Sequence, residues 1–293
     1  MKKFFFPLLG LLFTFALACS NDNGGGAGND DDGNGTVDKS ANLLATGASA
    51  NDILSNEKFD KLLIEAAYVT GFRPTQEAMD NFQDYLRQYT FKDDIEVIYK
   101  ELPSPNEESL TLQEIADLEE ENRTAYNDGS TLAIYIYFAD APSEDDDEDE
   151  GLVTLGAVYR NTSMVIHEKT IRTIAGRSLT ITDADVETAT LNHEFGHLFG
   201  LVNLGTVPVN AHEDGESENH CNVDGCLMQA ELRFSVAGKS SSTIKSKNGI
   251  ASACSLQGQT VLKMLEQQTA RGLSAVPGLD SECVLDLQNN GGQ

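Results

Sequence analysis

The chain has 293 residues, enough for one large or two small domains with a buried core. Its 47 acidic and 20 basic residues give a formal net charge of -27. Nucleic acid is therefore excluded as an expected partner, because phosphate binding needs a cationic surface. Hydrophobic residues make up 40% of the sequence, which is typical of a globular protein and not of a disordered one.

Residues 1–18 have the pattern of an export signal. Two lysines precede an apolar run, and the small residue Ala18 stands directly before Cys19. This segment resembles the signals of bacterial lipoproteins, and the resemblance implies that Cys19 becomes lipidated. The alternative is a secreted protein that is cleaved at an ordinary small-residue site.

Residues 19–40 follow as a lipidated cysteine and a flexible tether. The stretch is rich in Gly, Asn and Asp and has too few apolar side chains to fold. Ser20 stands where inner-membrane retention signals have Asp. We therefore expect a lipid anchor in the outer membrane, with exposure on the outer face as one arrangement.

Hydrophobic periodicity predicts helices and strands along the rest of the chain. Residues 41–92 form a predicted N-terminal helical region with amphipathic helices at 52–69 and 75–92, either a helical pair or a prosegment. Further elements are predicted as strands at 95–99, 132–138, 153–159 and 164–167, and as helices at 110–126 and 182–199. Seven consecutive acids at 144–150 indicate a solvated loop.

The sequence His193-Glu194-Phe195-Gly196-His197 is an HExxH pattern, and it lies late in the helix predicted at 182–199. Histidines four residues apart share one helix face, so both imidazoles can reach one Zn²⁺. Zinc lowers the pKa of a bound water to about 7, and Glu194 is placed to accept its proton. A catalytic zinc needs a third protein ligand, for which the candidates are His220, His212 and Asn203.

The HExxH pattern, the following Gly200 and the later Met228 resemble the metzincin zinc metalloproteases. The resemblance implies an α+β fold with a mixed twisted sheet, a long active-site helix and an irregular C-terminal subdomain. It places the upper catalytic subdomain at 93–200 and the lower one at 201–293. It also implies a turn at Met228 beneath the metal, and it extends to bacterial lipoproteins described as membrane metalloproteases.

The third ligand departs from the common metzincin pattern, which has His where this chain has Asn203. The run from His220 and Cys221 to Cys226 and Met228 is similar to archaemetzincins, in which the third zinc histidine directly precedes a cysteine. This resemblance favours His220. His212 is the alternative, and Asn203 ranks third because an amide oxygen is a weak zinc ligand beside imidazole.

The strand predicted at 164–167 resembles the metzincin edge strand that pairs with an extended peptide. The resemblance implies that Met164, Val165 and Ile166 bind substrate by β-augmentation. His167 at its end is expected to be a structural residue, because neither spacing nor motif singles it out as a ligand.

Four cysteines follow Cys19 in the sequence: Cys221, Cys226, Cys254 and Cys283. An even number in an exported protein favours disulfides, with Cys221 to Cys226 as the nearest pair. Archaemetzincins place four cysteines on a second, structural zinc, which is the alternative.

These features predict a lipid-anchored zinc endopeptidase with Zn²⁺ as cofactor, Glu194 as general base and a polypeptide as substrate. The main alternative is a catalytically inactive zinc-binding surface lipoprotein that holds a peptide or glycan. A lipoprotein whose histidines bind no metal is the third reading. Occlusion by residues 52–92 or by the acids at 144–150 is a conceivable form of activation control.

Overall fold

The computed structural model describes residues 38–147, 153–229 and 258–293. The expectations for the signal at 1–18, for Cys19 and for Cys254 lie outside this part of the chain. The helices of the described part are η1 (Ser40–Asn42), α1 (Ala50–Leu54), α2 (Gln76–Tyr89), α3 (Leu112–Asn122), α4 (Glu168–Ala175), α5 (Asp183–Leu198), α6 (Gly258–Ala270) and α7 (Ser281–Asn289). The strands are β1 (Lys61–Val69), β2 (Asp94–Leu102), β3 (Thr131–Phe138), β4 (Gly156–Arg160) and β5 (Ser163–Ile166).

The five strands form one mixed sheet in the order β2-β1-β3-β5-β4. Strands β2, β1, β3 and β5 all run in the same direction, and β4 runs antiparallel to them beside β5. Helices α2 and α3 make the crossovers between the first three parallel strands. The mixed sheet is therefore confirmed, and most of its strands are parallel.

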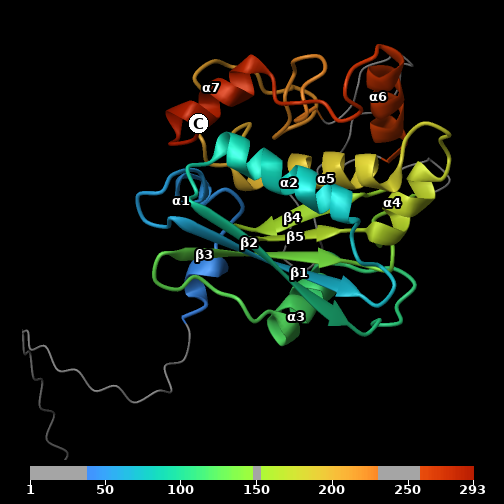
Figure 1. Cartoon of the computed structure of the whole chain (residues 1–293), viewed down its shortest axis with the longest axis horizontal. Coiled ribbons are helices and arrows are strands. Elements are labelled where there is room, and N and C mark those ends of the chain that lie inside the picture. The colour runs from blue at the N-terminus through green and yellow to red at the C-terminus, as the bar shows by residue number, and fades with distance from the viewer. Residues whose placement is uncertain (1–37, 148–152, 230–257) are drawn as a thin grey trace, which may run out of the picture. The chain divides into compact units, whose positions relative to one another are not determined.

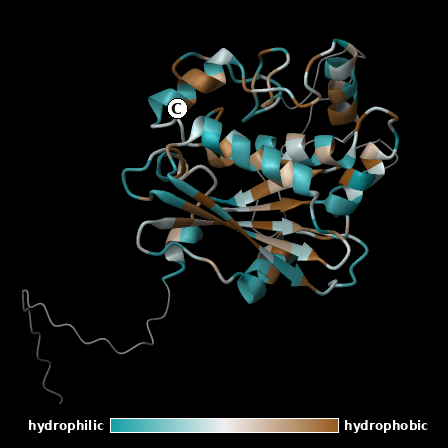
Figure 2. Ribbon diagram, viewed as in Figure 1, coloured by the Kyte–Doolittle hydropathy of each residue, from teal (hydrophilic) through white to brown (hydrophobic). Residues whose placement is uncertain are grey.

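Helices cover both faces of this sheet, with α3 on one face and α2, α4 and α5 on the other (Figure 1). Strand β3 explains why both faces are covered. Its successive side chains point to opposite faces of the sheet, and nearly all of them are buried. Leu132, Ile134 and Ile136 join the larger core with α2 and α5. Tyr135 and Tyr137 join the smaller core with α3. Figure 2 shows the apolar residues that run along the strands.

Strand β1 overturns the predicted helix at 52–69 and with it the N-terminal helical region at 41–92. Lys61–Val69 is a central strand paired on both sides, and the described residues before it hold only the three-residue η1 and the five-residue α1 as helices. A strand buried on both faces lacks the alternation of an exposed one, so its apolar run also fits a helix. Its one acid, Glu65, is buried and accepts hydrogen bonds from the backbone N–H groups of Thr124 and Ala125.

This strand also removes the idea of a separable prosegment at 52–92. A segment that supplies a central strand to the sheet cannot leave without opening the core. The other predicted elements agree with the structure within a few residues, whereas η1, α4, α6 and α7 have no counterpart in the prediction. Helices α6 and α7 also correct the expectation of an irregular C-terminal subdomain, since both lie within 201–293. Residues 144–147 of the acidic run lie in a loop, as predicted, and the remaining acids lie outside the described residues.

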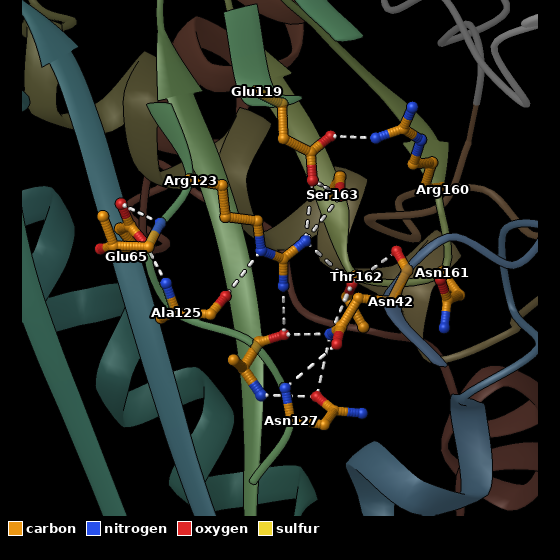
Figure 3. A network of polar contacts seen from close by, with 12 residues as sticks. Asn42, Glu65, Glu119, Arg123, Ala125, Asn127, Arg160, Asn161, Thr162 and Ser163 are labelled. Atoms are coloured by element: carbon orange, nitrogen blue, oxygen red, sulfur yellow. Dashed lines mark hydrogen bonds and ion pairs between the residues drawn. The ribbon is translucent and has the colours of Figure 1, made fainter. Parts of the chain in front are cut away.

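A buried polar network fastens α3 and the segment before α1 to the sheet (Figure 3). At its centre Arg123 pairs with Glu119 at 2.8 Å and donates to the carbonyl oxygens of Ala125 and Ala133. Asn42 joins this network and donates to Ala133 O and to Thr162 Oγ1. The first described residues are thereby attached to the ends of β3 and β5.

Among the described residues no helix combines the length and the apolar character needed to cross a membrane.

Candidate metal centre and active site

Helix α5 carries the HExxH residues, and its own sequence explains where it starts and stops. Thr182 caps its N-terminus by accepting from Asp185 N–H, and the Asp185 carboxylate accepts from Thr182 N–H in return. At the other end Gly200 has φ +73°, the left-handed conformation that glycine adopts at least cost. The capping box and the left-handed glycine thus set the two ends of α5.

Three histidines converge beside this helix. The candidate ligand atoms of His193, His197 and His220 all lie within 4.8 Å of one another. The two Nε2 atoms of His193 and His197 are 3.2 Å apart, as their spacing on one helix face predicts. His220 reaches them from the loop that follows Gly200, and its ring centroid lies 5.4 Å from that of His193.

Backbone carbonyl groups orient two of these rings. His193 Nδ1 lies 2.7 Å from Leu227 O, and His220 Nδ1 lies 2.9 Å from Glu218 O. Because a carbonyl oxygen only accepts, each Nδ1 carries the proton and each Nε2 presents its lone pair to the cluster. This is the arrangement that metal-binding histidines require, with the second ring nitrogen held by an acceptor.

Burial keeps the three rings in the neutral form. Burial, with His220 nearby, lowers the pKa of His193 to about 3, and burial lowers the pKa values of His197 and His220 as well. Neutral imidazole is the form that coordinates metal. Three neutral imidazoles of this kind match the protein ligands of a catalytic zinc site.

Glu194 lies in the same place and is fully buried. Neither of its carboxyl oxygens has a hydrogen-bond partner of ordinary geometry among the described residues. Burial raises its pKa well above the usual range, and only the backbone of Val158 on β4 opposes that effect. A buried carboxyl group without a well-formed hydrogen bond is costly, which fits a group that would be completed by a bound metal and water.

Two glycines let other groups approach this cluster. A Cβ on Gly196 would lie 2.2 Å from Met228 Sδ, so Met228 packs directly against the helix between the two histidines. A Cβ on Gly156 would lie 2.9 Å from Glu194 Cγ, so β4 runs close beside the carboxyl group. Met228 thus lies in a turn that packs against α5. Gly156 was not predicted, because only the sheet order brings it to the helix.

The alternative third ligands lie elsewhere. His212 is 2.7 Å from Asp286 Oδ2 through Nε2 and 3.3 Å from Cys221 Sγ through Nδ1. Asn203 is exposed and donates its side-chain amide to Glu213. Of the three candidates, only His220 joins the HExxH pair, so the preference for His220 agrees with the structure.

The cysteines form a second cluster instead of the predicted disulfides. Cys221, Cys226 and Cys283 are free and buried, and the sulfur atoms of Cys226 and Cys283 lie 3.7 Å apart. The predicted Cys221 to Cys226 bond is therefore absent, and the separation of the Cys226 and Cys283 sulfurs is well beyond the roughly 2.05 Å of a disulfide. Two of the three cysteines, Cys221 and Cys283, lie with His212 and Asp280 in a group whose donor atoms are all within 4.8 Å of one another, a set that zinc also accepts. Asp286 holds the His212 ring from its other nitrogen.

The expected substrate strand is also corrected. Met164, Val165 and Ile166 belong to β5, which lies between β3 and β4 and is fully buried. The edge of the sheet on this side is β4, because the antiparallel hairpin folds it outside β5. His167 is a structural residue, as predicted, with Nδ1 2.9 Å from Ala141 O and a pKa that burial lowers to about 4.

The comparisons with known proteins add one structural likeness. The crystal structure of archaemetzincin from Methanopyrus kandleri is similar, with a TM-score of 0.44 and 14% sequence identity, over 79% of this chain and 96% of that chain. No family model and no curated protein matches the sequence. The histidine cluster and Glu194 therefore carry the functional assignment.

Proposed function

We propose that this protein is a zinc-dependent endopeptidase that hydrolyses peptide bonds in extracellular or periplasmic polypeptides. One observation carries the proposal: three neutral imidazoles, from His193, His197 and His220, converge beside the buried carboxyl group of Glu194. Three histidines with an adjacent carboxyl group are the set that metal-assisted hydrolysis needs.

The roles of the residues follow from their positions. A bound zinc supplies a Lewis acid and lowers the pKa of water. Glu194 accepts a proton as general base and passes it to the leaving amine, since its oxygens have no competing partner of ordinary geometry among the described residues. His193, held by Leu227 O, and His220, held by Glu218 O, would hold the metal through their Nε2 atoms.

A peptide substrate would lie along β4, where the described residues supply no further strand. An extended peptide can add to such an edge by backbone hydrogen bonds. Gly156 on this strand lies against Glu194, so a peptide paired with β4 would bring its carbonyl groups toward the base. Polypeptide is thus the substrate class that the edge strand favours.

The alternative is a zinc-binding surface lipoprotein without catalysis that holds a peptide or glycan partner. The complete burial of Glu194 and His197 favours it, because a substrate must reach groups with no exposed surface. Substituting Glu194 separates the two functions. A peptidase loses hydrolysis in Glu194→Gln, whereas a binding protein keeps both its metal and its partner.

Zinc content tests the proposal directly. The full chain, solubilised in detergent and purified without added metal, should carry about one zinc, and His220→Ala should lose it while His212→Ala keeps it. About two zincs would show that the cysteine cluster with His212 also holds metal. No zinc, even after reconstitution, would overturn the peptidase and the inactive zinc-binding alternative together.

We also propose that the chain is anchored to the outer membrane through lipid on Cys19, with secretion as the alternative. The support is the sequence pattern around Cys19. Labelling with a radioactive fatty acid should mark the wild-type chain and not Cys19→Ala. An unlabelled wild-type chain in the medium would favour secretion.

A further inference from the structure

The three histidines of the proposed metal site are held in different ways. His193 and His197 stand on α5, whose regular backbone fixes their separation. His220 stands on a loop, residues 199–229, that contains turns and no helix or strand. A loop residue reaches a fixed place only if contacts within the loop hold it there.

One carboxylate joins the two ends of this loop segment. Glu213 Oε1 accepts from the backbone N–H of Asn219 at 2.8 Å, directly before His220. Glu213 Oε2 accepts from the side-chain amide of Asn203, just beyond the end of α5. The single side chain of Glu213 therefore connects the helix that carries two histidines to the turn that carries the third.

Both anchoring points are left-handed turns. Asn203 has φ +68° and Asn219 has φ +65°, a conformation that Asn tolerates better than most residues. Val202, with φ +52°, is β-branched and strongly disfavours this region. A turn with this backbone persists only when its surroundings hold it, and the Asn203 to Glu213 contact is one such tie.

The backbone around Glu213 points to the same role. Glu213 forms an isolated antiparallel bridge with Cys221, on the far side of His220. The neighbouring Asp214 donates its N–H to His220 O at 2.7 Å. Residues 213–221 thus form a loop whose two ends are paired with each other, and Glu213 lies at the paired end, next to His220.

We propose that Glu213, through Asn203 and Asn219, is the positioning residue that sets the place of His220 and hence the metal affinity of the site. This inference rests on the proposed zinc site. Asn203 lies apart from the three histidines, and in this proposal it fixes the loop that carries His220 by its hydrogen bond to Glu213.

The first test is the zinc affinity of the full chain in detergent, measured by competition with a chromophoric chelator. Glu213→Ala should weaken zinc binding by about 10-fold or more, the usual scale for lost supporting contacts at a metal site. It should also change the visible absorption of the cobalt(II)-substituted protein, which reports ligand geometry. Asp224→Asn, which removes an exposed carboxylate from the same loop, is the matched control and should change neither.

The second test exchanges the two partners. Asn203→Asp sets two carboxylates against each other and should weaken zinc binding as Glu213→Ala does. The double variant Asn203→Asp with Glu213→Gln lets the glutamine donate to the new carboxylate and accept from Asn219 N–H. It should restore the affinity and the cobalt spectrum of the wild type, which a general loss of folding would not do.

The outcomes separate this inference from the proposed function. A wild-type chain that binds no zinc overturns both. A wild-type chain that binds zinc, with unchanged affinity and cobalt spectrum in Glu213→Ala and Asn203→Asp, overturns the positioning role alone. Weaker binding in the single variants and recovery in the double variant support it.

Discussion

Two buried polar clusters of this molecule differ in how completely the fold satisfies them. In the network around Arg123, the guanidinium group donates through all three nitrogens to Glu119, Ser163 and backbone carbonyls (Figure 3). In the cluster around Glu194, both carboxyl oxygens and His197 Nδ1 lack a partner of ordinary geometry among the described residues. The chain itself satisfies the guanidinium group of the first cluster, whereas the carboxyl group of the second keeps its oxygens free for the proposed metal and water.

The largest expected effect comes from the incomplete cluster. Glu194→Gln should lower peptide hydrolysis by about 10²–10⁴-fold, the usual contribution of a general base. The melting temperature should not fall, because the substitution replaces a buried carboxyl group that makes no ordinary hydrogen bond. A peptidase assay beside a thermal melt checks both halves. Loss of stability together with activity would show that Glu194 supports the fold and would contradict its role as general base.

Removing the centre of the complete cluster should have the opposite signature. Arg123→Ala removes one of the two ion pairs of the buried Glu119 carboxylate and the side-chain donor to two buried carbonyl groups, so it should cost about 3–5 kcal/mol of unfolding free energy. Urea denaturation measures the change. Arg87→Ala, which breaks the exposed pair with Asp84, is the control and should cost about 1 kcal/mol or less. Equal costs would refute the contrast between a buried network and a surface pair.

A smaller effect is expected where packing supports the histidines. Gly196→Ala places a methyl group against Met228 Sδ, and overpacking of this kind should cost about 1–3 kcal/mol. The cost should shrink when Met228→Ala is added, since the contact is then removed. Chemical denaturation of the two single variants and the double variant tests this. Full additivity of the two substitutions would contradict the direct contact.

A change that is gradual with pH concerns a pair of buried carboxyl groups, Glu168 on α4 and Glu187 on α5, which lie beside Arg172 and Thr75. Burial raises the pKa of Glu168 from 4.5 to about 9, so between these values the folded chain holds a proton that the unfolded chain has released. Stability should therefore fall as pH rises through this window, by at most about 1.4 kcal/mol per pH unit.

Glu168→Gln should flatten this pH dependence, because glutamine cannot titrate. Glu57→Gln, at an exposed position, should leave the slope as it is in the wild type. Unfolding free energies measured across the pH range decide the question. If unfolding free energy depended on pH in Glu168→Gln as it does in the wild type, the folded chain would not hold a proton on this pair of carboxyl groups.

The sequence predicted the parts of the site that depend on local chemistry. The spacing of His193 and His197 on one helix face and the cap at Thr182 are properties of short segments, so they could be read without a structure. Strand β1 could not be distinguished from a helix, because its apolar run is buried on both faces and Glu65 breaks it once. The neighbouring strands decide that this run forms a strand, and the hydrophobic periodicity of the run carries no information about them.

Long-range convergence accounts for the remaining differences. His212 meets Asp286, 74 residues away, and Cys226 meets Cys283, 57 residues away, so no local pattern could foretell the second cluster. The edge strand was expected at β5 and is instead β4. This difference has the same origin, since strand order depends on how the hairpin of β4 and β5 folds back. The preference for His220 depended on a family resemblance and not on spacing alone.

The attachment of Asn42 has a mechanical consequence. Asn42 is fully buried and bonds to Asn127, Ala133 and Thr162, and Leu44 N–H donates to Asn161 nearby. A pull exerted on the chain ahead of residue 38 would load these bonds and pass into β3 and the hairpin of β4 and β5 before reaching α5. These hydrogen bonds tie the leading end of the described chain to β3 and to the hairpin of β4 and β5, so a force applied there would act first on the sheet.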